Sequence, residues 1–139
     1  MGAQIYYPGQ GHNNPAVVTI HGVFSLSSSP AKKAGKGWSV ARTGAGIFVV
    51  TLTDPFVKQC LGAFASLAQD VDSDTEDYNG KVNLVPDAGG DIYDVDNKQL
   101  TFHVLLDDDT SGVPALDDGD AGDLVSFVAF FSKSSLPVT

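Results

Sequence analysis

The chain of 139 residues is long enough for one domain with a single core, and its hydrophobic content of 42% is ordinary for a soluble globular protein. A single cysteine, Cys60, excludes an internal disulfide framework, and the first residues lack the basic and apolar regions of a signal peptide. No apolar run approaches the ~20 residues that a membrane-spanning helix needs, and a net charge of −9 argues against nucleic-acid binding. We therefore expect neither a membrane nor nucleic acid as a partner.

Charge is distributed unevenly along the chain. Residues 1–53 carry four basic side chains and no acid, a net of +4, whereas residues 54–139 carry all seventeen acids and four lysines, a net of −13. This segregation suggests two different faces, one that docks and one that faces water. Sixteen of the acids are Asp, which favours turns and caps, and with fifteen Gly and seven Pro they indicate many turns and little helix.

Two parts are expected along the chain: an extended N-terminal arm over residues 1–15 and a single β domain over residues 16–139. The arm contains Pro, Gly and Asn residues that prevent regular structure, together with the large apolar cluster Ile5, Tyr6 and Tyr7. It is either a frayed terminus or a segment that inserts these side chains into a partner.

In chain order, period-two alternation predicts about eight strands, spaced as in an antiparallel β-sandwich or barrel. The first has Val18, Ile20, Phe24 and Leu26 on one face, with Gly22 at a bulge or a close approach. The Gly-containing segment Thr43–Gly46 predicts a hairpin turn. The predicted strands are Ala16–Leu26, Gly37–Arg42, Ile47–Thr53, Ala63–Ala68, Lys81–Val85, Asp91–Val95, Gln99–Leu106 and Leu124–Phe131.

The other segments are predicted as one short helix and three loops. Asp54 followed by Pro55 is typical of a helix start, which predicts a helix over Pro55–Leu61. Ser27–Lys36 is expected to be a flexible basic loop. Gln69–Gly80 and Asp107–Asp123 are expected to be acidic loops.

One acidic segment resembles a metal site. Asp70-Val-Asp72-Ser-Asp74 begins like a calcium-binding loop, but Thr75 stands where that loop requires Gly and Lys81 where it requires a bidentate Glu. We interpret this segment, and likewise Leu116–Asp123, as a solvated acidic loop; an adventitious divalent ion is the alternative.

The remaining candidates for metal-binding or catalytic residues do not form a group in the sequence. His12, His21 and His103 lack metal-ligand spacing, and Cys60 has no His nearby in the sequence. The turn at Thr43–Gly46 precedes a strand, not the helix that a nucleotide-binding loop requires. We therefore expect no catalytic residue, no metal and no cofactor.

The hairpin carries a resemblance to a known family. The residues that carry it are Trp38, Val40, Arg42, Thr43, Gly44, Gly46, Phe48, Val50, Thr51, Leu52 and Asp54. Their pattern is similar to that of small virion structural proteins of tailed bacteriophages, the capsid decoration or cement proteins, and the resemblance extends over residues 16–131. The resemblance implies a β-rich protein, often a homotrimer, that is made in the host cytoplasm and sits on the outer capsid surface against the major capsid protein.

These observations favour a non-enzymatic cement protein that docks through its acid-free segment. The residues expected to contact the capsid are Ile5, Tyr6, Tyr7, Lys32, Lys33 and Lys36. A carbohydrate-binding β-module is one alternative, for which Trp38, Tyr78 and Tyr93 are the available aromatic side chains. A tail, neck or fibre component of the virion and a small two-carboxylate hydrolase are the others.

Overall fold

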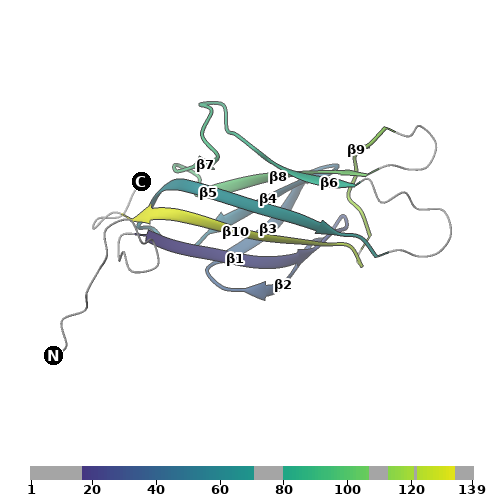
Figure 1. The fold of residues 1–139 in the computed structure, drawn as a ribbon, viewed down its shortest axis with the longest axis horizontal. Helices are drawn as coiled ribbons and strands as arrows, with labels where there is room; N and C mark the ends of the chain where they lie inside the picture. Colours follow the sequence, from purple (N-terminus) through teal and green to yellow (C-terminus); the bar gives the residue numbers. More distant parts are fainter. Residues whose placement is uncertain (1–16, 71–79, 107–112, 121, 134–139) are drawn as a thin grey trace.

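A computed structural model of the chain describes residues 17–70, 80–106, 113–120 and 122–133. These residues form ten strands in two antiparallel sheets that lie as two layers (Figure 1). The predicted all-β antiparallel sandwich is confirmed, and the barrel alternative is wrong because each sheet ends in two edge strands. The strands are β1 Val17–Ser25, β2 Ala31–Gly35, β3 Trp38–Gly44, β4 Ile47–Leu52, β5 Val57–Ala68, β6 Lys81–Val85, β7 Tyr93–Asp94, β8 Gln99–Leu106, β9 Ala115–Leu116 and β10 Leu124–Lys133.

The order of strands places the beginning and the end of the described chain side by side. Sheet A has the order β2-β1-β10-β5, and sheet B has the order β3-β4-β8-β6. In sheet A, β10 pairs with β1 on one side and β5 on the other. In sheet B, β8 has β4 along one edge and β6 along the other. The two-residue strands extend these edges: β9 pairs with β8 beyond the end of β4, and β7 pairs with β8 beyond the end of β6.

The predicted helix at Pro55–Leu61 is wrong. Pro55 and Phe56 form a turn, and Val57 begins the twelve-residue strand β5. Asp54 does cap this turn, since its carboxylate accepts the N–H of Phe56 at 2.8 Å. The same Asp-Pro signal begins an Asx turn as readily as a helix, and pairing with β10 along Val57–Ala68 selects the extended conformation.

The predicted basic loop Ser27–Lys36 is partly wrong, because Ala31–Gly35 forms the edge strand β2 beside β1. Besides this pairing, the side chains of Ser25 and Lys32 hold the strand. The Ser25 hydroxyl accepts the Ala31 N–H at 3.3 Å. The Lys32 ammonium donates to the Trp38 carbonyl at 2.9 Å and lies 5.2 Å from the centre of the Trp38 ring. Two further predictions were too broad: the strand predicted at Asp91–Val95 is limited to Tyr93–Asp94, and the loop predicted at Asp107–Asp123 contains β9.

The core between the sheets is built around aromatic rings. The Phe24 ring lies with its centre 5.9 Å from those of Phe48 and Phe102, 6.2 Å from that of Trp38 and 6.4 Å from that of Phe127. These rings come from both sheets, and all are almost completely buried. Such edge-to-face and tilted contacts stabilise a core beyond the burial of their area.

The predicted close approach at Gly22 is confirmed. The indole of Trp38, on β3 of sheet B, lies directly over Gly22 of sheet A, and a Cβ atom added at Gly22 would overlap three indole atoms. The Trp38 indole N–H donates to the His21 carbonyl at 3.1 Å, which fixes the ring against β1. The glycine is therefore the residue that lets the two sheets approach at this point.

Replacing Gly22 with Ala is expected to lower the free energy of unfolding by about 1–3 kcal/mol or more, the usual cost of overpacking a core. Gly62 on β5 provides the matched control, because no atom lies within 4 Å of a Cβ added there. Gly62→Ala should leave stability unchanged or raise it by about 0.5–1 kcal/mol. Urea unfolding followed by tryptophan fluorescence measures both variants, and equal stabilities would contradict the packing described above.

Candidate docking surface

The outer face of sheet A carries exposed apolar side chains and no charge at its centre. Alternation along β1, β10 and β5 turns every second side chain away from the core. Phe64 is 69% exposed and Phe130 36% exposed, although both are large aromatic residues. We call this surface the sheet A face; it consists of Thr19, His21, Val23, Gly62, Phe64, Ser66, Ser126, Val128 and Phe130.

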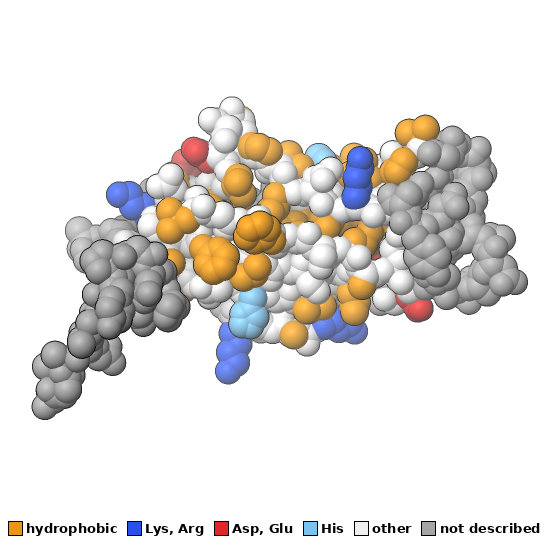
Figure 2. Space-filling view, in the orientation of Figure 1, with side chains coloured by type: hydrophobic (Ala, Val, Ile, Leu, Met, Phe, Trp, Pro, Cys, Tyr) orange, Lys and Arg blue, Asp and Glu red, His pale blue; other side chains and the backbone are white. Residues whose placement is uncertain are grey.

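Strand register arranges these side chains in rows across the sheet. His21, Val128 and Phe64 form one row, and Thr19, Phe130 and Gly62 form the next. A shallow depression of about 300 Å³ lies at β5 and β10 beside Phe64 and Val128. Figure 2 shows the resulting group of hydrophobic side chains over β5 and β10. Large apolar side chains exposed together on one face make this surface a candidate docking site.

Leu61, next to Gly62 of this patch, lies at a local irregularity. The register between β5 and β10 shifts between Phe130 and Phe131, which pair with Gly62 and Cys60, so Leu61 is the extra residue. Its side chain is 55% exposed. Bulges of this type redirect side chains and raise local twist.

The docking residues predicted from the sequence lie in different places in the structure. Lys32 is engaged within the chain by its contacts to Trp38. Lys33 is exposed on β2, and Lys36 lines a groove with Thr19, His21 and Gly35 at the margin of the sheet A face. Ile5, Tyr6 and Tyr7 lie outside the described residues. The structure therefore brings Lys36 to the candidate surface and leaves Lys33 exposed on the neighbouring edge strand.

The two aromatic residues of this surface, Phe64 and Phe130, are not among the docking residues predicted from the sequence. Phe130 was expected within a central apolar strand, and Phe64 within a strand of small residues. A signal for Phe64 is present in the sequence: it is out of phase with Ala63, Ala65 and Leu67, which pack against the core. A large aromatic residue on the opposite phase of such a strand must point outward.

Among the described residues, acidic side chains are absent from this surface. Every described Asp lies in a connection between strands or in the two-residue strand β7. Several of them tie loops together. Asp118 accepts the Arg42 Nε–H and the Gly46 N–H, both at 2.8 Å, and Asp123 accepts the N–H groups of Asp70 and Asp120. The hydrogen bond from Arg42, with that from Gly46, lowers the pKa of Asp118.

The sequence predicts one docking face and one water-facing face, and the described charges are arranged differently from this simple division. Among the described residues, acids occupy the connections at the ends and edges of the sandwich, and the sheet A face between them is uncharged. The acidic loop predicted at Gln69–Gly80, with its calcium-like segment, lies mostly outside the described residues. In the part of the chain that the structure describes, no three His, Cys, Asp or Glu side chains gather as metal ligands would.

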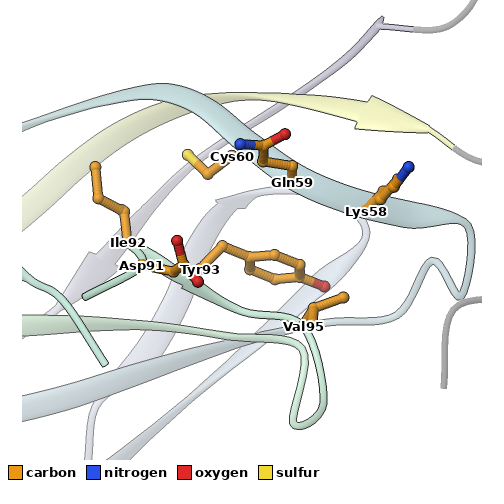
Figure 3. A pocket seen from close by; sticks show the side chains of 7 residues that line it. All are labelled: Lys58, Gln59, Cys60, Asp91, Ile92, Tyr93 and Val95. Carbon is orange, nitrogen blue, oxygen red and sulfur yellow. The ribbon is translucent and has the colours of Figure 1, made fainter. Parts of the chain in front are cut away.

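A separate pocket of about 270 Å³ lies where β5 meets the segment that contains β7 (Figure 3). Burial raises the pKa of the Cys60 thiol, and burial with the nearby Asp54 and Asp94 raises the pKa of Tyr93 to about 12. Both shifts favour the protonated form, which disfavours a thiolate nucleophile and a phenolate base at this pocket. The lining residues are Lys58, Gln59, Cys60, Asp91, Ile92, Tyr93 and Val95.

The two described histidines, His21 and His103, do not lie close together. His21 lies on the sheet A face, whereas His103 lies on β8 in the other sheet and alternates with the buried residues Phe102 and Val104. His12 lies outside the described residues. The two described imidazoles are thus on opposite outer surfaces of the sandwich.

Comparison of the chain with protein-family models, curated proteins and solved structures found no match. No helix long and apolar enough to cross a membrane is present within the described residues. The case for a function therefore depends on the surface itself, on the distribution of charge and on the hairpin pattern.

Tyr93→Phe is expected to keep or raise the free energy of unfolding, by up to about 1–3 kcal/mol. The reason is that the Tyr93 hydroxyl is buried and has no hydrogen-bond partner among the described residues. Its folded-state pKa of about 12 lies above the ordinary value of 10, so its contribution to stability is complete below pH 10 and is lost as pH rises toward 12.

Alkaline titration by ultraviolet absorbance tests this assignment. The chain has four tyrosines, and one of them should ionise late, near pH 12, in the wild type. That late step should be missing from Tyr93→Phe, whose stability should also decline less above pH 10. A late step that persists in this variant would mean that another tyrosine is the buried one.

Proposed function

We propose that this protein is a non-enzymatic structural protein of a phage virion, which decorates the capsid and stabilises it by binding the outer surface of the shell. Its partner is then the major capsid protein, and its location is the surface of the virion. The observation that carries the proposal is the sheet A face, an uncharged apolar surface on a chain of net charge −9. Because the described acids all lie off this face, it can approach another acidic surface with little repulsion from them.

The mechanism of stabilisation is contact area. A stable interface buries on the order of 1,600 Å² in total, with a few fully covered aromatic side chains contributing most of the affinity. Phe64 and Phe130 are the two exposed aromatic residues of the sheet A face. Covering each with a partner contributes about 1.5–3 kcal/mol before the costs of association.

Two further features support a capsid as the partner. The hairpin β3–β4 carries the residue pattern through which the chain resembles capsid decoration proteins. Lys33 and Lys36 lie on or next to β2, at one margin of the sheet A face. They are suited to contact acidic groups of a shell around an apolar centre, the usual arrangement of a protein interface.

The carbohydrate-binding alternative is weakened by the positions of its aromatic residues. Trp38 is 2% exposed and Tyr93 4% exposed, so neither offers a ring face to a sugar. Tyr78 lies outside the described residues. Binding on a glycan array would nevertheless revive this alternative, and binding to isolated tails in place of capsids would favour another virion component.

Phe64→Lys is expected to weaken binding to capsids that lack this protein by about ten- to hundredfold, because 1.4 kcal/mol corresponds to a factor of ten. Leu116→Lys is the matched control, since Leu116 is 42% exposed on β9 of sheet B and away from the sheet A face. Co-sedimentation across a range of protein concentrations measures occupancy, and circular dichroism checks that both variants fold.

The outcomes separate two kinds of failure. A wild-type protein that does not co-sediment with capsids at all contradicts the proposed function. If the wild type binds and Phe64→Lys binds equally well, the function stands and the sheet A face is not the docking surface.

Deletion of residues 2–14 tests the contribution of Ile5, Tyr6 and Tyr7. The free energy of unfolding should not change, because β1 begins at Val17 and every core residue among the described residues follows it. Capsid occupancy at limiting protein concentration should fall sharply, since three adjacent large apolar side chains are lost. If the protein that lacks residues 2–14 still saturates capsids at the wild-type concentration, the capsid contact involves only the sheet A face and its basic margin.

A further inference from the structure

The strands at the edges of the two sheets differ in how they are protected from pairing with another chain. An edge strand presents unpaired N–H and C=O groups, and natural proteins protect such edges with short strands, charged residues, Pro or bulges. Within the described residues, β2 and β5 are the edges of sheet A, and β3 and β6 are the edges of sheet B.

Three of these edges carry such protection. Strand β2 has five residues, includes Lys32 and Lys33, and has an irregular register with β1. Strand β6 also has five residues, begins at the exposed Lys81 and is followed by Pro86. Strand β3 carries Arg42 in an ion pair with Asp118, and its register with β4 shifts at that point.

Strand β5 has little protection of this kind. It is the longest strand, with twelve residues, and residues 59–69 contain no charged side chain and no Pro. From Gly62 to Ala68 its register with β10 is regular, and its other edge, although close to β6 of sheet B, is not hydrogen-bonded to any described strand. Phe64, the most exposed large hydrophobic residue among those described, lies on this part of the strand.

We propose that β5 pairs antiparallel with β5 of a second copy of this chain, around a two-fold axis close to Phe64, so that the two A sheets form one continuous sheet. An axis at Phe64 places each outward residue opposite another outward residue, with Gly62 facing Ser66 of the second copy. The two Phe64 rings then meet at the axis between small residues, and aromatic cross-strand pairs of this kind stabilise a sheet.

The charges that flank β5 are compatible with a second copy at this edge. Two chains of net charge −9 repel each other wherever their acids approach. The nearest charged residues along β5 and its ends are Lys58 and Asp70. In the antiparallel arrangement Lys58 of one copy runs toward the Asp70 end of the other, so that opposite charges flank the paired segment.

The same contrast among edges selects a dimer over the trimer that the family resemblance implies. A cyclic trimer held by strand pairing needs two different edges, because each copy contacts its neighbours through unlike surfaces. The other three edges are protected, so β5 finds an unprotected counterpart only in another β5. A self-complementary two-fold contact closes at two copies.

This inference does not depend on the proposed capsid function. If both hold, the two sheet A faces lie on the same side of the joined sheet, and each dimer docks through two faces at once. The second contact is then intramolecular, which raises overall affinity without any new kind of interaction.

Light scattering combined with size exclusion tests the pairing without any capsid. The chain has a mass of 14.5 kDa, so the wild type should approach twice that value as concentration rises. Ser66→Lys, at an exposed position beside the axis, is expected to raise the dimer dissociation constant at least about tenfold. Thr19→Lys on the sheet A face and Ser39→Lys on β3 are the matched controls, and both should remain dimeric.

Hydrogen exchange gives an independent measurement. Amides of residues 62–68 should become better protected as the wild-type concentration rises, and should not do so in Ser66→Lys. Ala68→Lys replaces Ser66→Lys if the latter shows a lower melting temperature.

A wild type that remains at 14.5 kDa up to about 1 mM, or a trimeric mass, would overturn the proposal. So would dissociation caused by Thr19→Lys, which would indicate pairing through the face, or by deletion of residues 2–14, which would indicate exchange of the N-terminal segment.

Discussion

The contact between the Trp38 indole and the backbone of β1 is the constraint on which the rest of the sandwich depends. One ring on sheet B meets Gly22 and Gly35 of sheet A, and neither position has room for a Cβ atom. Its N–H is satisfied by the His21 carbonyl, and the Lys32 ammonium lies over its ring. This single side chain therefore sets the separation of the sheets, seats the edge strand β2 and aligns the aromatic core around Phe24.

The turns and the uncharged surface have a common origin in the use of Asp. Four turns are closed by an Asp carboxylate that accepts the N–H of the residue two positions later: Asp54 to Phe56, Asp87 to Gly89, Asp94 to Asp96 and Asp117 to Gly119. Each is a local Asx turn, which stabilises a change of chain direction. Because the described acids are used in connections, the strands of sheet A remain free of them, and a protein of strong negative charge keeps an apolar face.

The sequence predicts the elements better than it predicts their neighbours. Strict alternation identified β1, β8 and β10, and the Gly-containing turn identified the β3–β4 hairpin. The helix predicted at Pro55–Leu61 was wrong because the Asp-Pro signal is local, whereas the partner of β5 is β10, more than fifty residues away. The edge strand β2 was missed because its residues, Ala-Lys-Lys-Ala-Gly, have low strand propensity and are held by Ser25 and Trp38. For the same reason the exposure of Phe64 could be inferred from its phase only once β5 was known to be a strand.

The pairing of β1 with β10 has a consequence for how the chain is made. These strands pair along nine residues but are separated by about a hundred positions in the sequence. At roughly 5–20 residues per second, a ribosome completes β1 some 5–20 s before β10. Until then β5 lacks its hydrogen-bonded neighbour, and the inner residues Ile20 and Phe24 of β1 have no completed sheet around them. Strands β3, β4 and β8 can pair earlier, since all their partners precede β10. Sheet A is thus completed only by its final strand, β10. This non-local order slows folding and leaves β5, whose one charged residue is Lys58, without its partner in the nascent chain.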